Sequence, residues 1–307
     1  MTKVFIDGSA GTTGLRIRER LSVRKDIGLI ILPEKTRKDP SARAEALNTA
    51  AVSFLCLPDA AAAEAASFVT DPDAVIIDTS TAHRVAEGWV YGMPELAGQR
   101  EKIRTAKRIA NPGCHATGFI SLVAPLTAAG LIRKDARLAC FSLTGYSGGG
   151  KKMIAEYESP GRDPLYQAPR QYGLTQSHKH LPEMAKICGL DYAPVFCPVV
   201  APYYAGMEVT VPLTPAETDA SPEEIREVYR AYYQDGLIRC TESSGENGFL
   251  SAGALAGRDS LEVSVFGNEE RILLVSRFDN LGKGASGAAI QNMNIALGLD
   301  EAEGLVR

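Results

Sequence analysis

The start of the chain places the strongest constraint on its fold. Residues 3–7 read as a short β-strand, and the apolar spacing of residues 15–21 predicts a helix. Between them lies Gly8-Ser9-Ala10-Gly11-Thr12-Thr13-Gly14, whose three glycines allow a tight turn directly into the helix. A strand, a glycine turn and a helix in this order are typical of the first unit of a doubly wound parallel sheet.

The same alternation continues along the first third of the chain and then stops. Strands are expected at 27–32, 52–57 and 74–78, with helices at 40–50 and 59–68. Later strands, at 137–145, 193–200, 207–212, 261–267 and 271–279, have no regular intervening helix. We therefore expect an α/β chain with two domains. Residues 1–113 would form a doubly wound parallel-sheet dinucleotide-binding domain, and 114–283 an α+β catalytic domain with a mixed or antiparallel sheet. A helix within 284–307 is expected to pack back on the first domain.

Composition narrows the class of partner. The chain has 307 residues, 45% of them hydrophobic, which is enough for two cores. A net charge of −4 argues against nucleic acid or an anionic membrane surface as partner. No stretch is long and apolar enough for a signal peptide or a membrane span, so we expect a cytoplasmic protein that binds small molecules. The six cysteines contain no CxxC pair, which favours reduced thiols and no metal site.

The glycine turn is the expected cofactor site. Backbone amides at a helix start can hold a pyrophosphate, and the hydroxyls of Thr12 and Thr13 add donors. Pro58 and Ser80 follow later strands, where βα loops usually meet ligands, and are included in this site. The alternative is a glycine turn that binds nothing.

Charged residues after the second strand bear on the choice of dinucleotide. Lys35, Arg37 and Lys38 suit the 2′-phosphate of NADP, whereas Glu34 alone would suit the ribose hydroxyl of NAD. We favour NADP, with three solvated surface charges as the alternative.

One cysteine is singled out as a nucleophile. Cys114 ends Asn111-Pro112-Gly113-Cys114 and precedes a helix expected at 116–129, whose N-terminus would favour the thiolate. The other cysteines lie in apolar strands or near helix ends and are expected in the core. A buried, inert thiol is the alternative for Cys114.

A proton carrier must come from four histidines. His178 and His180 would share one face of an extended segment, and Glu183 would orient one of the imidazoles. The choice between them stays open, with a preference for His178 because of its reach toward Glu183. His115 adjoins the nucleophile, but its side chain is expected to diverge from Cys114. A surface histidine pair is the alternative.

Several groups are candidates for holding the substrate's anionic ends. The segment 145–152 ends a strand and opens a helix expected at 153–158, which gives bare amides and ammonium groups at a positive helix end. Arginine can clamp a carboxylate or phosphate with two bonds. The expected substrate-binding residues are Arg84, Arg108, Asn111, Ser147, Gly148, Gly149 and Lys151, with Arg170 as a further anion holder, and their ranking stays open.

Five motifs in order carry a family resemblance. They are the glycine turn 8–14, Asp78-Thr79-Ser80-Thr81-Ala82-His83-Arg84, Asn111-Pro112-Gly113-Cys114, Gly145-Tyr146-Ser147-Gly148-Gly149-Gly150 and His178-Lys179-His180-Leu181-Pro182-Glu183. Over essentially its whole length the chain resembles the N-acetyl-γ-glutamyl-phosphate reductase family of arginine biosynthesis, in its shorter form. That family usually has an aromatic residue and a proline between the cysteine and Thr-Gly, where this chain has His115-Ala116.

The resemblance implies NADPH-dependent reduction of N-acetyl-L-glutamyl 5-phosphate to the 5-semialdehyde and phosphate. Cys114 would form the thioester, the Cys114 amide or a neighbouring donor would hold the oxyanion, and His178 or His180 would relay the proton. A homo-oligomer, dimer or tetramer, is expected. Three alternatives remain: another semialdehyde dehydrogenase, such as the aspartate type; a cofactor-free cysteine hydrolase or acyltransferase; and a non-catalytic redox sensor that binds a dinucleotide.

Overall fold

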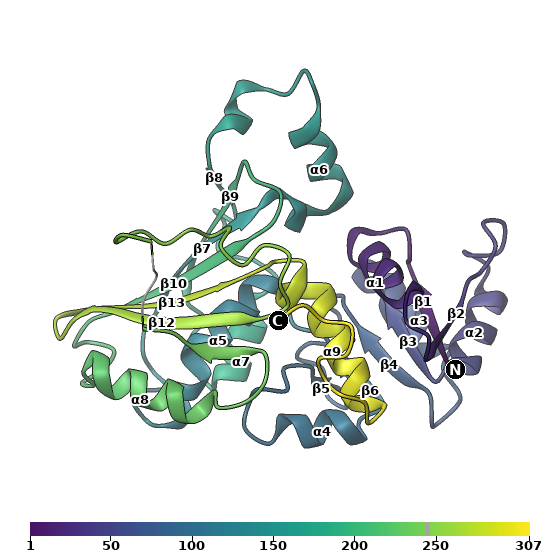
Figure 1. Ribbon diagram of the computed structural model, residues 1–307, viewed down its shortest axis with the longest axis horizontal. Helices are drawn as coiled ribbons and strands as arrows, with labels where there is room; N and C mark the ends of the chain where they lie inside the picture. Colours follow the sequence, from purple (N-terminus) through teal and green to yellow (C-terminus); the bar gives the residue numbers. More distant parts are fainter. Residues whose placement is uncertain (243–245) are drawn as a thin grey trace. The chain divides into compact units, whose positions relative to one another are not determined.

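The computed structural model describes residues 1–242 and 246–307 (Figure 1). The chain divides into two compact units. Unit 1 comprises Met1–Pro112 and Ala285–Leu305, and unit 2 comprises Gly113–Gly284 and Val306–Arg307.

Unit 1 is built on a six-stranded sheet whose neighbouring strands are all parallel. The strand order is β2-β1-β3-β4-β6-β5. The strands are β1 Thr2–Asp7, β2 Ile27–Ile30, β3 Val52–Leu55, β4 Val75–Asp78, β5 Val90–Tyr91 and β6 Arg108–Ala110.

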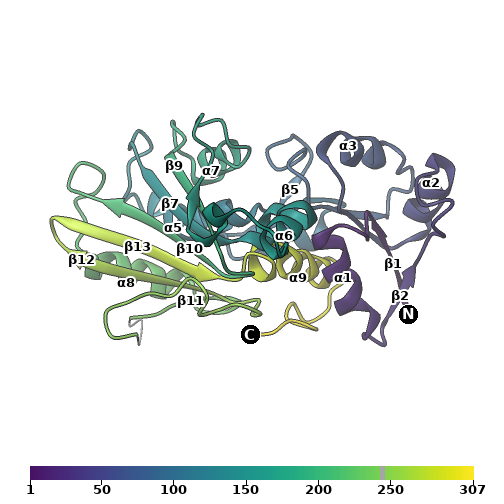
Figure 2. The same ribbon diagram turned by 90° about the horizontal axis from the view of Figure 1, so that it is seen from above.

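Helices cover both faces of this sheet, as a doubly wound fold requires. The helices are α1 Thr12–Ser22, α2 Pro40–Thr49, α3 Asp59–Ser67, α4 Gln99–Thr105 and α9 Gly287–Ala296. One core joins α1, α4 and α9 to the sheet through Ile17, Ile103 and Ile290. The other joins α2 and α3 through Leu47 and Ala62. Figure 2 shows α2 and α3 on one side of the strands and α1 on the other.

The strand order reverses at β1, between β2 and β3, which is where ligands bind in open α/β sheets. Gly8 follows β1 at this point with φ of +86°, and a Cβ there would lie 2.3 Å from the Cys56 carbonyl oxygen. Only glycine allows this approach of the first loop to the end of β3.

Unit 2 contains a seven-stranded mixed sheet in the order β11-β12-β13-β10-β7-β9-β8. The strands are β7 Ala139–Gly145, β8 Arg170–Gln171, β9 Val195–Ala201, β10 Met207–Leu213, β11 Ile238–Cys240, β12 Leu261–Asn268 and β13 Arg271–Phe278. Its helices are α5 Cys114–Ala128, α6 Gly150–Glu158, α7 Leu181–Cys188 and α8 Pro222–Tyr232, and α8 lies alongside β12 (Figures 1 and 2).

Helix α5 forms the core of unit 2. It is buried on all sides from His115 to Leu126, and it packs against α7, α8, β10 and β13. Pro125 inside the helix has no N–H, so the carbonyl of Ser121 loses its usual partner. The Tyr233 hydroxyl donates to that carbonyl at 2.7 Å, in a buried position. Packing and a side-chain donor thus compensate for the helix break.

The opposite face of the unit 2 sheet carries exposed apolar side chains. Phe141 on β7, Val195 on β9 and Leu273 on β13 are 55%, 61% and 43% exposed. We call these three residues the outer patch. The residues that alternate with them, such as Cys140 and Phe196, are buried against the helices. The sheet therefore has one face packed by helices and one face that carries these exposed apolar side chains together with the buried residues Val275, Glu262 and Arg277.

The expected fold class is confirmed, with differences at the element ends. Helix α5 begins at Cys114 rather than at residue 116, and α9 begins after a π-helical turn at Gly282–Ser286. Sequence reasoning missed β5, β6, β8 and β11, which have two or three residues each and are too short to show a period.

Candidate active site

The glycine turn of unit 1 opens helix α1 as expected. Gly11 caps the helix without any side-chain hydrogen bond, so the first helical amides have no protein cap. Gly14 lies so close to the turn that a Cβ would meet the Gly8 carbonyl oxygen at 2.5 Å. Thr12 Oγ1 is buried and has no hydrogen-bond partner within the described residues. Amides and a hydroxyl without acceptors indicate a site for an anionic group.

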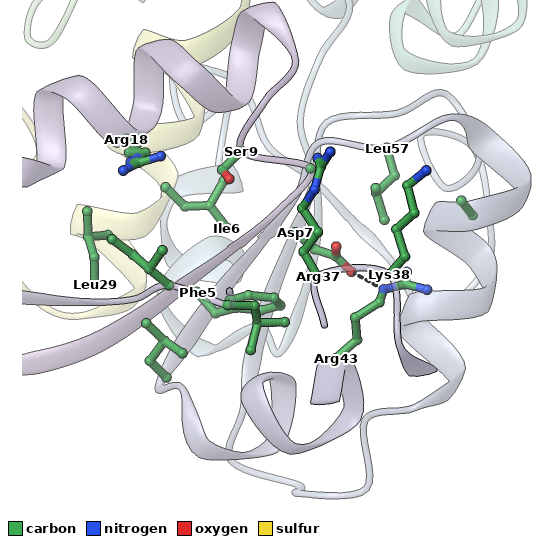
Figure 3. A pocket seen from close by; sticks show the side chains of 15 residues that line it. Phe5, Ile6, Asp7, Ser9, Arg18, Leu29, Arg37, Lys38, Arg43 and Leu57 are labelled. Atoms are coloured by element: carbon green, nitrogen blue, oxygen red, sulfur yellow. Dashed lines mark hydrogen bonds and ion pairs between the residues drawn. The ribbon is translucent and has the colours of Figure 1, made fainter. Parts of the chain in front are cut away.

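A pocket of about 280 Å³ opens beside this turn (Figure 3). It is lined by the ends of β1 and β2, by Gly8 and Ser9, and by Leu57. Arg37 and Lys38 line it as expected, and Figure 3 shows their side chains on the same side of the pocket as Asp7. Lys35 is not among its lining residues. Glu34 forms an exposed ion pair with Arg37 at 2.6 Å.

Arg43 is a pocket residue that sequence reasoning missed. It is 7% exposed, and its Nε donates to Asp7 Oδ2 at 3.0 Å. A second nitrogen donates to Glu64 Oε2 at 3.0 Å, and Nη2 is buried without a partner within the described residues. Burial raises the pKa of the Asp7 carboxyl, although Arg43 acts in the opposite direction. The wall of the pocket is therefore a fixed, charged network. Nothing in the sequence around Arg43, which lies on α2, indicated that this residue would line a pocket.

The end of β4 is organised by Asp78. Its carboxylate accepts bonds from the Ser80 amide and hydroxyl and lies 2.6 Å from His83 Nδ1. The His83 ring stacks on Trp89 at 3.9 Å. Ser80 thus lies at the ligand edge of the sheet, as expected, with its hydroxyl directed to Asp78.

In unit 1, three residues that were expected to bind the substrate donate side-chain hydrogen bonds to backbone carbonyls. Arg84 donates to the carbonyls of Asn111 and Thr79. The Asn111 side-chain amide donates from Nδ2 to the Ala285 carbonyl and accepts at Oδ1 from Asn292 Nδ2. Arg108 starts β6, at the opposite edge of the sheet from the ligand loops, and donates to carbonyls of residues 74 and 107. The structure does not bring Arg108 to the site, because a strand's first residue lies at the wrong edge, and we leave it out.

In unit 2 the candidate nucleophile is the first residue of α5. Cys114 follows the cap residue Gly113, whose amide donates to Glu183 Oε2 at 3.2 Å. A Cβ on Gly284 would lie 3.0 Å from Cys114 Cβ, so this wall of the thiol site admits only glycine without a shift. The helix N-terminus favours a thiolate here.

The two candidate histidines lie close together just before α7. The ring centroids of His178 and His180 are 4.7 Å apart, and His180 Nε2 lies 4.0 Å from Glu183 Oε1. The structure places His180 beside Glu183, and the choice between His178 and His180 as proton carrier stays a prediction. His115 joins the cluster, 5.6 Å from His178 and 5.5 Å from His180 between ring centroids. The only sequence signal for His115 was its departure from the family pattern.

The glycine-rich segment after β7 forms a 3-10 turn, Tyr146–Gly149, before α6. Ser147 is buried and its Oγ accepts from Asn280 Nδ2 at 3.0 Å. Gly148, Gly149 and Lys151 are all exposed. Arg170 donates to the Tyr157 hydroxyl and lies over the Tyr166 ring. Ser147 is therefore held by the fold, and Arg170 is engaged by aromatic side chains.

All six cysteines are unbridged. Cys140 and Cys188 are buried as expected for core thiols, whereas Cys56, Cys197 and Cys240 are half-buried. Within 1–242 and 246–307, no cluster of three or more His, Cys, Asp or Glu side chains is arranged to hold a metal ion. In the same part of the chain, no helix is long and apolar enough to cross a membrane.

Comparison with known proteins identifies the family of this chain. The model of the semialdehyde dehydrogenase dimerisation domain matches residues 114–280, and that of the semialdehyde dehydrogenase NAD binding domain matches 33–106. A Nostoc N-acetyl-gamma-glutamyl-phosphate reductase 2 is 45% identical, with 99% of each chain covered. The chain belongs to this reductase family. The Brucella ovis N-acetyl-gamma-glutamyl-phosphate reductase is 46% identical over 96% of this chain and 99% of its own, and the Pseudomonas putida reductase 2 is 42% identical over 98% of each.

Solved structures show the same fold at greater distance. Aspartate semialdehyde dehydrogenase II from Vibrio cholerae superposes with a TM-score of 0.73 at 18% identity, covering 97% of this chain and 98% of its own. The Candida albicans enzyme gives 0.69 at 14%, covering 96% and 99%. The chain is thus an oxidoreductase of the semialdehyde dehydrogenase class with a nicotinamide-dinucleotide domain.

Proposed function

We propose that this protein reduces N-acetyl-L-glutamyl 5-phosphate to N-acetyl-L-glutamate 5-semialdehyde, with NADPH as reductant. The observation that carries the proposal is Cys114 at the first position of α5, beside a Glu183-bound amide and a histidine cluster. Reductases of this name are 42–46% identical over nearly the whole chain.

The chemistry divides one difficult step into two. The Cys114 thiolate attacks the acyl carbon, the carbon–oxygen bond to phosphate breaks, and inorganic phosphate leaves with the electron pair. A dinucleotide bound to unit 1 would supply a hydride to the resulting thioester. The oxyanion that this leaves takes a proton from a protonated histidine to give the thiohemiacetal. The same histidine then takes the hydroxyl proton back, the carbon–sulfur bond breaks, and the aldehyde leaves the regenerated thiolate.

The residues of unit 2 have separate roles in these steps. The amide at the start of α5 donates to the oxyanion, where a preorganised donor is worth about 3 kcal/mol. His180, paired with Glu183, takes the thiohemiacetal proton, and His178 is the second candidate. Ser147, Gly148, Gly149 and Lys151 are proposed to meet the substrate's anionic groups.

The residues of unit 1 fit a dinucleotide. The amides of α1 and the unpartnered Thr12 hydroxyl would hold the pyrophosphate, within the turn from Gly8 through Ser9, Ala10 and Thr13 to Gly14. Pro58 and Ser80 would border the rest of the cofactor. Arg37 and Lys38 line the adjacent pocket, and their positive charges would suit a 2′-phosphate, which supports NADP over NAD.

The test is phosphate-dependent reduction of NADP⁺ by N-acetylglutamate semialdehyde. The native protein should turn over, and Cys114→Ser should lose at least about 10³-fold in kcat. Cys197→Ser, which changes a cysteine on a strand away from the motif, is the matched control and should retain activity. Full activity in Cys114→Ser would remove the thiol mechanism. The same assay with aspartate semialdehyde tests the aspartate alternative, which the family names disfavour.

We also propose that a second copy of the chain covers the outer patch. The matching family model for 114–280 is described as a dimerisation domain, and contiguous exposed apolar side chains usually mark an interface. A cytoplasmic setting is proposed from the unbridged cysteines.

A further inference from the structure

The pocket beside the glycine turn contains a carboxylate among its cationic side chains. Asp7, the last residue of β1, lines this pocket and is buried. Arg37 and Lys38 line the same pocket and are both exposed. If the 2′-phosphate of NADPH binds beside Arg37 and Lys38, as proposed above, the negative charge of Asp7 would oppose its binding. A pocket that accepts this phosphate therefore needs a cation that neutralises Asp7.

Arg43 on α2 is positioned to neutralise this carboxylate. Its Nε donates to Asp7 Oδ2 at 3.0 Å, and the two side chains are 9% and 5% exposed. Because little water reaches the pair, the two charges are screened less than those of a surface ion pair. Figure 3 shows the Arg43 guanidinium at the Asp7 carboxylate, within the wall of the pocket.

The other cations of the pocket do not form this ion pair. Arg37 pairs instead with Glu34 at 2.6 Å, in an exposed position. Within 1–242 and 246–307, Arg43 is the only cation that forms an ion pair with Asp7. Arg37 and Lys38 thus stay at the surface of the pocket, where a phosphate could reach them, and Arg43 alone compensates the charge of Asp7.

Neighbouring side chains fix the Arg43 guanidinium in this place. Its Nη1 donates to Glu64 Oε2 on α3 at 3.0 Å. The guanidinium carbon lies 5.5 Å from the centroid of the Phe68 ring, which is within the range of a cation–π contact. Contacts from α3, β1 and Phe68 therefore hold the charge in position before any cofactor binds, so that binding requires no ordering of this side chain.

We propose that Arg43 determines the preference for NADPH over NADH by neutralising Asp7, so that the pocket accepts a 2′-phosphate. Without Arg43, a buried carboxylate would face the phosphate, and the pocket would discriminate less between the two dinucleotides because an acidic side chain suits ribose hydroxyls and repels phosphate. Arg43 is a positioning residue in this account, since it acts through Asp7. The inference rests on the proposed cofactor and is independent of the chemistry at Cys114.

The first test measures the binding of NADPH and of NADH to the full chain without substrate, by fluorescence titration. Arg43→Met removes the charge and keeps much of the volume, so the Kd for NADPH should rise at least about tenfold and that for NADH less than about threefold. Arg100→Met is the matched control, because Arg100 pairs with Glu301 and does not line the pocket. It should change neither Kd. Equal rises for both dinucleotides in Arg43→Met would indicate a merely structural role and overturn the inference.

A double-mutant cycle tests whether Arg43 acts through Asp7. Asp7→Asn removes the repelling charge and keeps the shape, so it should lower the Kd for NADPH about threefold or more and leave that for NADH unchanged. In the Asp7→Asn background, Arg43→Met should raise the Kd for NADPH by at most about threefold, because no carboxylate remains to be neutralised. A tenfold rise in both backgrounds would overturn the proposed route. Asp7→Asn also stands as a test by itself if Arg43→Met folds poorly, since an unchanged ratio of the two Kd values would contradict the inference.

A conservative variant separates charge from shape. Arg43→Lys keeps the positive charge near Asp7 and should keep most of the preference for NADPH, whereas a preference lost as fully as in Arg43→Met would contradict neutralisation. The native protein distinguishes this inference from the proposed function. If it binds neither dinucleotide, the proposed cofactor fails and the inference fails with it. If it binds NADPH and the Arg43 and Asp7 variants leave the ratio of the two Kd values unchanged, the inference alone fails.

Discussion

At the scale of single residues, the three glycines of the turn 8–14 have different roles. Gly8 and Gly14 are required by the turn itself, since a Cβ at either would lie within 2.5 Å of a carbonyl oxygen. A Cβ at Gly11 would meet its neighbours at 3.5 Å or more, which is ordinary contact. Gly11 also has an extended backbone, φ −72° and ψ 167°, that any residue adopts.

Gly11→Val should therefore weaken cofactor binding and leave the stability of the fold nearly unchanged. Its branched side chain would occupy the space beside the helix amides, and we expect the Kd for NADPH to rise at least about tenfold, about 1.4 kcal/mol. Fluorescence titration measures the Kd, and urea unfolding should change little. Gly14→Ala is the contrasting variant and should lower stability. A Kd unchanged in Gly11→Val would show that the turn does not hold the cofactor.

Acid should destabilise the protein partly through His115. Its folded pKa of about 3 lies below the ordinary value of about 6.5, so the unfolded chain binds the extra proton first. This contribution to stability is complete above pH 6.5 and is lost as the pH falls toward 3. At pH 5 the loss is about 2 kcal/mol.

His115→Gln removes this titration and keeps a polar side chain. The free energy of unfolding, measured with urea between pH 7 and 5, should then fall less steeply than in the native protein. Equal slopes in both proteins would mean that His115 is not kept neutral by the fold.

For single residues, the sequence predicted which side chains belong to the candidate site better than it predicted their contacts. The positions of Cys114, Gly11 and Arg37 follow from local motifs, because a turn and a helix start are defined by neighbouring residues. His115 and Tyr172 are 57 positions apart, and their contact depends on how α5 meets the sheet. The assignment of Arg108 to the substrate site was wrong because β6 was too short to be recognised from the sequence. Without that strand, the end of the sheet at which Arg108 lies could not be predicted.

At the scale of elements, α5 shows how a broken helix is repaired. Pro125 leaves the Ser121 carbonyl without its helical partner, and Tyr233 supplies the missing donor from a buried position. Tyr233→Phe should lower the free energy of unfolding by about 1–2 kcal/mol, because the carbonyl would remain buried and unpaired.

Urea unfolding measures this loss. Tyr192→Phe, which removes a hydroxyl from a tyrosine on the surface, is the control and should change stability by less than about 0.5 kcal/mol. Equal effects of the two changes would contradict the role given to Tyr233.

Long elements were predictable and short ones were not. Strands such as β12 and β13 carry enough apolar residues to be recognised from the sequence. The faces of β7 were less predictable, because Ser142 is buried and Phe141 is exposed. The two residues of β5 pair with β6 only because the sheet already exists beside them. Such strands depend on tertiary contacts rather than on their own sequence.

At the scale of the whole molecule, the outer patch predicts assembly. Phe141→Asp places a charge on an apolar face, so we expect the native dimer or tetramer to dissociate toward monomer by at least about tenfold in Kd. Analytical ultracentrifugation measures it. Tyr204→Asp, another exposed aromatic position outside the patch, is the control. A native protein that is already monomeric would contradict this proposal.

Covalent capture of the acyl group by Cys114 can be observed without any reductant. Native protein is mixed with N-acetylglutamyl phosphate in the absence of NADPH, and released phosphate and protein mass are followed together. We expect a rapid release of about one phosphate per chain, an acyl adduct on the Cys114 peptide, and neither in Cys114→Ser. Phosphate release without an adduct on Cys114, or the same burst in Cys114→Ser, would contradict it.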